Sequence, residues 1–133
     1  MAGHKYILCI DDDADDCLLL GDAIRKENSS FKVEFIMSGD EAISFLRKAL
    51  EKDDLPGLIT LDINMPGMDG TETLTEIQNL IGPNRIPIVF LTTSPRDEEL
   101  FLAERNHISV MAKPRSARGY DDLAKTVSYM LLK

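Results

Sequence analysis

Short apolar runs alternate with amphipathic stretches along this chain, and the alternation repeats five times. The runs have the length of strands, and each amphipathic stretch places its apolar residues at helical spacing. Five strand-helix units predict parallel strands joined by right-handed crossovers, with helices on both faces. We therefore expect the α/β class, as a doubly wound five-stranded parallel sheet. The strands are expected at residues 5–10, 31–37, 58–62, 86–92 and 108–112.

The patterns also indicate where two strands lie and where three helices begin. Residues 58–62 are apolar with almost no alternation, which is typical of a strand buried on both faces. Residues 31–37 alternate apolar and polar, so we expect them at an edge of the sheet. Helix starts are expected at Asp13, at Ser38 in a capping box and at Ser94, with the last of these helices reaching about residue 106.

Length and composition favour an ordinary globular domain. The 133 residues are enough for one sizeable core, so we expect a single domain over residues 1–133. The chain is 44% apolar and 29% charged, and no apolar run approaches the roughly 20 residues of a membrane span. The first residues show no apolar signal segment, and we expect a cytoplasmic protein without membrane contact.

The charge balance narrows the class of partner. The net charge is −8, from 23 acidic and 15 basic residues. Nucleic-acid binding depends on basic surface, so a nucleic acid is not expected as a partner. An acidic surface favours solubility and a basic protein partner.

Polar residues lie at or just beyond the carboxyl ends of four of the predicted strands. Asp11 and Asp12 follow the first strand, Asp62 and Thr92 end the third and fourth, and Lys113 follows the fifth. Sites in doubly wound sheets form beyond these strand ends. Three clustered acids raise one another's pKa, and a cation is needed to relieve the repulsion. Carboxylates with a backbone carbonyl suit Mg²⁺, so we interpret the cluster as a metal site.

Such a site supports phosphoryl chemistry. One carboxylate can attack a phosphoryl group while the metal takes up charge, and Lys113 and Thr92 can hold the remaining oxygens. The sequence has neither a Gly-rich phosphate loop ending in Gly-Lys-Ser/Thr nor a Gly-x-Ser-x-Gly elbow. Asp13, Asp15 and Asp16 are expected to cap the first helix and compensate its dipole, without a role as ligands.

These motifs resemble the receiver domain of two-component response regulators over the whole chain. The resemblance rests on Asp11-Asp12, Asp62 with the loop 64–70, Thr92 and Lys113, each at the end of its own strand. It implies a flavodoxin-like strand order 2-1-3-4-5. It also implies that an aspartate accepts a phosphoryl group from a phosphohistidine on a sensor histidine kinase or a histidine phosphotransfer protein.

The resemblance assigns a role to each metal-site residue. Asp62 would be the phosphoacceptor. Asp12 would ligate Mg²⁺ directly and Asp11 largely through water, with Asp62 and the backbone carbonyl of Asn64 completing the protein's share. The cofactor is accordingly expected to be Mg²⁺.

Two more strand ends receive roles, and two positions depart from the family pattern. Lys113 would pair with the phosphoryl oxygens, Thr92 would move towards them, and the bond before Pro114 would be cis. Val110 stands where the family usually carries an aromatic residue, and a branched aliphatic cannot make the same rotation. Arg115 also replaces an aromatic residue. The resemblance therefore implies retained acceptor chemistry with altered signalling geometry.

We interpret the chain as a stand-alone receiver without an output domain, a signalling phosphoacceptor and not an enzyme, which acts on an unknown downstream protein. Two alternatives remain open. A Mg²⁺-dependent phosphohydrolase with an aspartyl nucleophile would need a second acid where Asn64 stands. A pseudo-receiver scaffold would bind partners without phosphorylation, which Val110 and Arg115 make conceivable but the acidic pocket disfavours.

Overall fold

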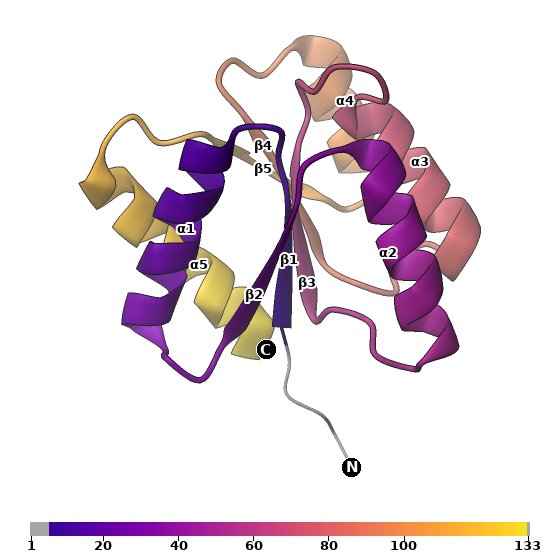
Figure 1. Ribbon diagram of the computed structural model, residues 1–133. Coiled ribbons are helices and arrows are strands. Elements are labelled where there is room, and N and C mark those ends of the chain that lie inside the picture. The colour runs from indigo at the N-terminus through magenta and orange to yellow at the C-terminus, as the bar shows by residue number, and fades with distance from the viewer. Residues whose placement is uncertain (1–5, 133) are drawn as a thin grey trace.

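Five parallel strands form one sheet in the order β2-β1-β3-β4-β5 (Figure 1). The structure is a computed structural model and describes residues 6–132. The order confirms the predicted doubly wound sheet. Lys5, with which the first strand was expected to begin, lies outside the described residues. The strands are β1 (Tyr6–Ile10), β2 (Lys32–Ile36), β3 (Leu58–Asp62), β4 (Ile88–Thr92) and β5 (Ser109–Ala112).

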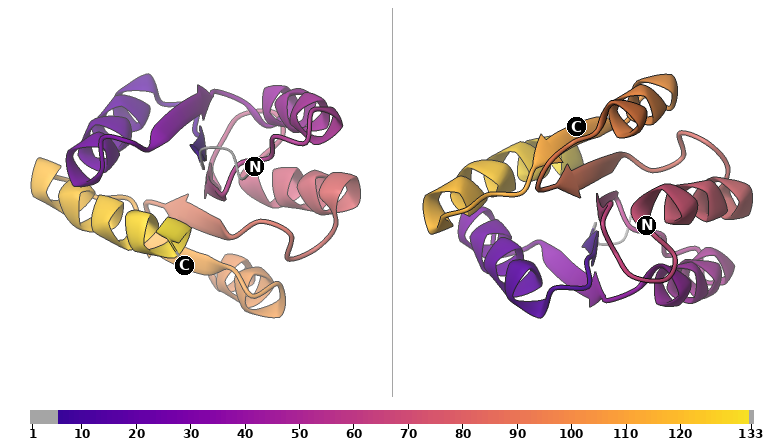
Figure 2. Two further views of the ribbon diagram at one scale, coloured as in Figure 1. Left: turned by 90° about the horizontal axis from the view of Figure 1, so that it is seen from below. Right: turned by 90° about the horizontal axis from the view of Figure 1, so that it is seen from above.

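Five helices cover the two faces of this sheet. Viewed along the sheet, α1 and α5 lie on one side, and α2, α3 and α4 lie on the other (Figure 2). No helix in the described part of the chain is long and apolar enough to cross a membrane. The helices are α1 (Ala14–Glu27), α2 (Gly39–Glu51), α3 (Gly70–Ile81), α4 (Asp97–Arg105) and α5 (Ala117–Leu132).

Burial separates the central strands from the edge strands. Every residue of β1, β3 and β4 is buried, whereas β2 and β5 are partly exposed. Along β1, Leu8 and Ile10 pack into the core beneath α2 and α3, and Ile7 and Cys9 pack into the core beneath α1 and α5. The predictions of a doubly buried third strand and an edge second strand are confirmed.

Local side chains fix most helix starts. The Asp13 carboxylate accepts hydrogen bonds from the first-turn amides of α1, as predicted. The Ser38 hydroxyl accepts one from Glu41 N at 3.2 Å, which is the Ser38 half of the predicted box. A full capping box instead starts α3, where Asp69 and Glu72 each accept a backbone N–H of the other.

The predicted start of α4 is wrong. The helix begins at Asp97, three residues after Ser94. The Ser94 amide donates to Thr92 Oγ1 at 3.3 Å, which keeps Ser94 in the turn that leaves β4. The Glu99 carboxylate accepts a hydrogen bond from Arg96 N at 2.9 Å. The N-cap is therefore Arg96, two residues after the expected N-cap Ser94. β4 also begins later than expected, directly after Pro87, which has no N–H to donate.

Candidate functional site

Three carboxylates meet at the carboxyl end of the sheet. Asp11 and Asp12 follow β1, and Asp62 is the last residue of the neighbouring β3, whose Leu61 pairs with Ile10. Asp11, Asp12 and Asp62 each place one oxygen within 4.8 Å of the others. Asp11 and Asp62 are buried and Asp12 is exposed, so the cluster opens to solvent on the Asp12 side.

Lys113 supplies positive charge to this cluster. It follows β5, and its amide donates to the Thr92 carbonyl at 2.9 Å, which extends the pairing of β4 and β5. Its Nζ lies 2.8 Å from Asp11 Oδ2 and 3.4 Å from Asp62 Oδ2. Burial alone would lower the pKa of Lys113, but its bonds to the carboxylates of Asp11 and Asp16 outweigh burial and raise it. The side chain is therefore a fixed cation.

The surroundings of Asp62 disfavour the charged form of its carboxyl group. Burial and the nearby charge of Asp11 raise the pKa of Asp62 to about 7, although Lys113 and the Asn64 N–H oppose the rise. The Asn64 amide donates to Asp62 Oδ1 at 3.2 Å. Near neutral pH the Asp62 carboxyl is therefore partly protonated. A metal cation that replaced this proton would be attracted by the carboxylates of Asp11 and Asp62.

The loop after Asp62 is held close by backbone contacts. The Gly70 amide donates to the Ile63 carbonyl at 2.8 Å. A Cβ atom at Gly70 would lie 2.6 Å from the Asp62 carbonyl oxygen and 2.5 Å from Ile63 Cα. No side chain fits there, because real Cβ atoms essentially never come this close to backbone. Gly70 thus lets the loop fold tightly behind the acidic cluster.

Thr92 is not among the residues that line the open side of the cluster. Its side chain is fully buried, and its Oγ1 accepts from Asn64 Nδ2 at 3.4 Å. The next residue, Thr93, lines the surface depression in front of the carboxylates. The structure therefore brings Asp11, Asp12, Asp62 and Lys113 together, and Thr92 contacts Asn64.

Sequence reasoning missed Asp16. Its Oδ2 lies 3.0 Å from Lys113 Nζ, so it is a contact of the site and not merely a first-turn acid. A signal was present, because Asp16 precedes Leu20 and Ile24 by one and two helical turns. Leu20 and Ile24 are both buried, on the side of α1 that faces the sheet. The spacing alone therefore places Asp16 on the same side of α1.

A second expectation is corrected by the backbone. The described residues contain no cis peptide bond, so the bond between Lys113 and Pro114 is trans. Trans is the form that most X-Pro bonds adopt.

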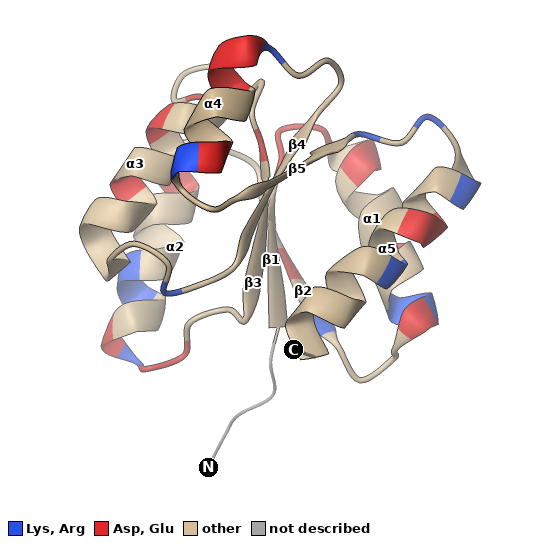
Figure 3. Ribbon diagram, turned by 180° about the vertical axis from the view of Figure 1, so that it is seen from behind, with Lys and Arg blue, Asp and Glu red and all other residues tan. Residues whose placement is uncertain are grey.

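The depression combines acid-rich walls with one ammonium. Figure 3 shows acidic segments at the starts of α1 and α4, towards this end of the sheet. Carboxylate oxygens are hard ligands, and this donor set fits a divalent cation that keeps several waters. The depression is lined by Asp12, Asp13, Ala14, Asp16, Asp62, Asn64, Thr93 and Lys113.

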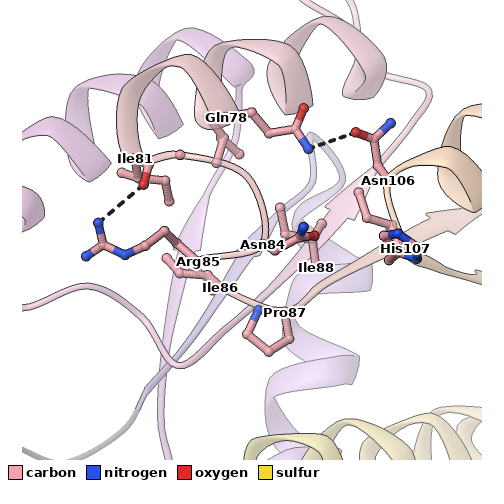
Figure 4. A pocket seen from close by; sticks show the side chains of 12 residues that line it. Gln78, Ile81, Asn84, Arg85, Ile86, Pro87, Ile88, Asn106 and His107 are labelled. Atoms are coloured by element: carbon pink, nitrogen blue, oxygen red, sulfur yellow. Dashed lines mark hydrogen bonds between the residues drawn. The ribbon is translucent and has the colours of Figure 1, made fainter.

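A different cavity of about 200 Å³ lies at the amino end of the sheet (Figure 4). Its walls carry the isoleucines of α3 and β4, and none of its lining residues is a carboxylate. Gln78 Nε2 donates to Asn106 Oδ1 at 3.1 Å, and Arg85 Nη1 donates to the Ile81 carbonyl at 3.3 Å. Without a carboxylate in its lining, this cavity lacks the acidic cluster that marks the carboxyl end of the sheet.

Comparison with known proteins identifies the fold and the family pattern. A family model described as the response regulator receiver domain matches residues 7–119. Response regulator Rcp1 of Synechocystis sp. is 30% identical over 125 residues, which cover 92% of this chain and 84% of that protein.

Solved structures align over nearly the whole chain. The phosphorylated cyanobacterial phytochrome response regulator RcpA aligns with a TM-score of 0.85 and 28% identity, covering 98% of this chain and 96% of its own. The Mn²⁺-bound form of Rcp1 aligns with a TM-score of 0.82 and 27% identity, covering 97% and 95%. The receiver domain of the Arabidopsis thaliana histidine kinase CKI1, in complex with Mg²⁺ and BeF₃⁻, gives 0.78 and 26%, covering 97% and 91%.

Proposed function

We propose that this chain, which belongs to the response regulator receiver domain family, accepts its phosphoryl group on Asp62. The chain is a phosphoacceptor of two-component signalling, and receiver domains of this family bind a divalent metal. One observation carries the assignment to Asp62. Its buried carboxylate ends β3, lies within 4.8 Å of Asp11 and Asp12, and lies 3.4 Å from the ammonium of Lys113.

The reaction is a transfer between a histidine and an aspartate. An Asp62 carboxylate oxygen attacks phosphorus and forms a P–O bond, while the P–N bond to the donor imidazole breaks. The imidazole leaves with the electron pair of that bond and takes up a proton from water. The partner that donates the group is a sensor histidine kinase or a histidine phosphotransfer protein.

The metal in this proposal is Mg²⁺, held by oxygens that the cluster already gathers. Asp12 and Asp62 would bind it directly, with the backbone carbonyl of Asn64. Both oxygens of Asp11 are engaged, one 2.8 Å from Lys113 Nζ and one accepting from Asp13 N at 3.0 Å, which suits a contact through water. When bound, the ion would neutralise charge on the phosphoryl oxygens. The CKI1 receiver structure, which contains Mg²⁺, supports this choice.

Lys113 and Thr92 would hold the remaining phosphoryl oxygens. Lys113 already contacts Asp62 and needs only to redirect one N–H donor. Thr92 is buried against Asn64 and Ser94, so its hydroxyl would have to leave these contacts to reach the group. We therefore expect phosphorylation to rearrange the turn that leaves β4.

The product acts as a signal and not as the intermediate of an enzyme. A downstream protein would read the changed surface, and an acidic chain of net charge −8 favours a basic contact on that protein. We place the chain in the cytoplasm, where the buried free thiols of Cys9 and Cys17 stay reduced.

Intact mass after incubation with Mg²⁺ and acetyl phosphate tests the proposal. We expect the gain of one phosphoryl group in the wild type and none in Asp62→Asn. Asp15→Asn is the matched control, because it removes an exposed carboxylate of α1 and should still be phosphorylated. Phosphorylation of Asp62→Asn would contradict the assignment.

Two other outcomes separate the alternative functions. Rapid release of phosphate over many turnovers would support a phosphohydrolase. No mass change with acetyl phosphate or with a cognate kinase would support a scaffold.

A further inference from the structure

Asp16 joins the acidic pocket to α5, although the phosphotransfer reaction assigns it no role. Its Oδ2 accepts a hydrogen bond from Lys113 Nζ at 3.0 Å, and its Oδ1 accepts one from Tyr120 Oη at 3.0 Å. Tyr120 lies in the first turn of α5. A single carboxylate therefore connects the ammonium of the pocket to a phenol on another helix.

Lys113 divides its donors among three acids. An ammonium has three N–H groups, and its distances to carboxylate oxygens are 2.8 Å for Asp11, 3.0 Å for Asp16 and 3.4 Å for Asp62. The two short contacts hold the ammonium closer to Asp11 and Asp16 than to the phosphoacceptor Asp62. A phosphoryl group on Asp62 brings new anionic oxygens that attract the same ammonium, and Asp16 then opposes its movement.

Tyr120 keeps Asp16 in this place. The Tyr120 side chain is only 5% exposed, so its hydroxyl depends on the bond to Asp16. α1 and α5 lie side by side in both directions of view (Figures 1 and 2). Their packed faces bury Ile24 against the same core as Leu123 and Val127. The two helices therefore cannot separate easily, and a change at Asp16 is transmitted to the phenol.

We propose that Asp16 is a positioning residue that competes with the phosphoryl group for Lys113, and that Tyr120 reports the outcome at the start of α5. The inference rests on the proposed role of Asp62. Loss of the Asp16 charge frees Lys113 and stabilises the phosphorylated state. Departure of Lys113 from Asp16 changes the charge felt by the Tyr120 hydroxyl.

Binding of beryllofluoride with Mg²⁺ tests the competition, because this anion mimics a phosphoryl group without covalent chemistry. Asp16→Asn should bind it roughly three- to tenfold more tightly, since one charged hydrogen bond no longer has to be broken. Asp15→Asn removes the same charge from the adjacent, exposed position and should change the affinity less than about twofold, as expected of a screened surface charge. An equal gain in both variants would show a general charge effect and overturn the inference.

A double variant separates competition from direct repulsion between Asp16 and the anion. In the Lys113→Ala background, Asp16→Asn should no longer increase the affinity. A gain that persists there would assign the effect to repulsion and contradict a role through Lys113.

The tyrosine signal provides an independent readout. The chain has three tyrosines and no tryptophan, so its near-ultraviolet spectrum reports tyrosine environments. Saturating beryllofluoride should change this spectrum in the wild type and in Asp15→Asn, and the change should be lost in Tyr120→Phe and strongly reduced in Asp16→Asn. A change that survives Tyr120→Phe would overturn the role of Tyr120.

The outcomes distinguish this inference from the function on which it rests. A wild type that binds beryllofluoride, with Asp16→Asn unchanged, would reject the inference and leave the phosphoacceptor role standing. A wild type that does not bind beryllofluoride in the presence of Mg²⁺ would reject both.

Discussion

The two ends of the sheet differ in chemistry although the same strands build both. At the carboxyl end, Asp11, Asp12 and Asp62 crowd within 4.8 Å of one another beside Lys113. At the amino end, the cavity in Figure 4 has isoleucine walls and no carboxylate among its lining residues. There, the Gln78 side-chain amide donates a hydrogen bond to Asn106 Oδ1.

Parallel topology explains the difference. All five strands run in the same direction, so the residues at or just beyond the carboxyl ends of β1, β3 and β5 lie close together. Sites in open α/β sheets form at this edge. The amino end receives the turns that enter the strands. Asn84 and His107 there have positive φ values of 61° and 56°, which reverse the chain before β4 and β5. The carboxyl end therefore gathers charged side chains, whereas the residues of the amino end form the turns that lead into the strands.

The largest expected effect comes from removing the cation of the carboxyl end. Lys113→Ala leaves the buried Asp11 and Asp62 without their counter-charge, and should lower the free energy of unfolding by about 3 kcal/mol at about pH 8 without metal. The loss should shrink towards about pH 5, because a protonated Asp62 needs no counter-charge. Denaturant unfolding at the two pH values measures it.

The matched control for this variant is a surface lysine. Lys26 pairs with Asp121 at 3.3 Å, and its side chain is 70% exposed. Lys26→Ala should cost less than about 1 kcal/mol, as exposed pairs do. Equal losses in the two variants would remove the distinction between the charged end and ordinary surface.

A smaller effect of opposite sign is expected at Asp62. Its pKa is raised to about 7 by burial and by Asp11, so its native carboxyl holds its proton where the unfolded chain releases it. Stability from this group is therefore lost as pH rises from the unfolded pKa through about 7. Asp62→Asn should be roughly 1–3 kcal/mol more stable than the wild type at about pH 8 and about equal at about pH 4. Each pKa unit is worth about 1.4 kcal/mol, and solvent on the open side of the cluster screens the charges and reduces the total.

Thermal and denaturant unfolding of metal-free protein across this pH range provide the measurement. A variant less stable than the wild type at the higher pH would contradict the raised pKa of Asp62.

Metal affinity comes next. Asp12→Ala removes the exposed carboxylate of the cluster and should weaken binding of Mg²⁺ or Mn²⁺ at least about tenfold, or about 1.4 kcal/mol. Isothermal titration calorimetry measures this, with Asp15→Ala as the control that removes an acid outside the cluster. Unchanged affinity in Asp12→Ala would place the metal elsewhere.

The smallest effect is expected at the amino end. Gln78→Ala removes the 3.1 Å bond to Asn106 and should cost about 1 kcal/mol or less, the usual net value of one hydrogen bond. Metal affinity and phosphorylation should not change. A clear loss of phosphorylation would show that the two ends are coupled.

Much of the fold could be predicted because its signals are local. The fivefold alternation gave the strand–helix units, and the unbroken apolar run of β3 indicated its central place. Asp13 announced α1. The start of α4 could not be predicted, because the Ser94 amide is taken by the Thr92 hydroxyl, a contact that depends on the turn itself.

The site was predictable only where a residue ends a strand or directly follows one. Asp62 ends β3, and Asp11, Asp12 and Lys113 follow β1 and β5, so the topology alone brings them together. Asp16 lies on a helix, and its contact with Lys113 depends on how α1 rotates and how α5 packs beside it. Thr92 ends its strand as expected, but its burial and the hydrogen bond that its hydroxyl accepts from Asn64 could not be predicted from the sequence.

Chemical mapping of the phosphoryl group tests the central claim most directly. An acyl phosphate on an aspartate is reduced by borohydride to homoserine, which peptide mass spectrometry can locate. After incubation with Mg²⁺ and acetyl phosphate, we predict homoserine at position 62 and aspartate at positions 11, 12 and 16. Homoserine at one of these other positions, or unmodified Asp62 in a protein that has gained a phosphoryl group, would contradict the account.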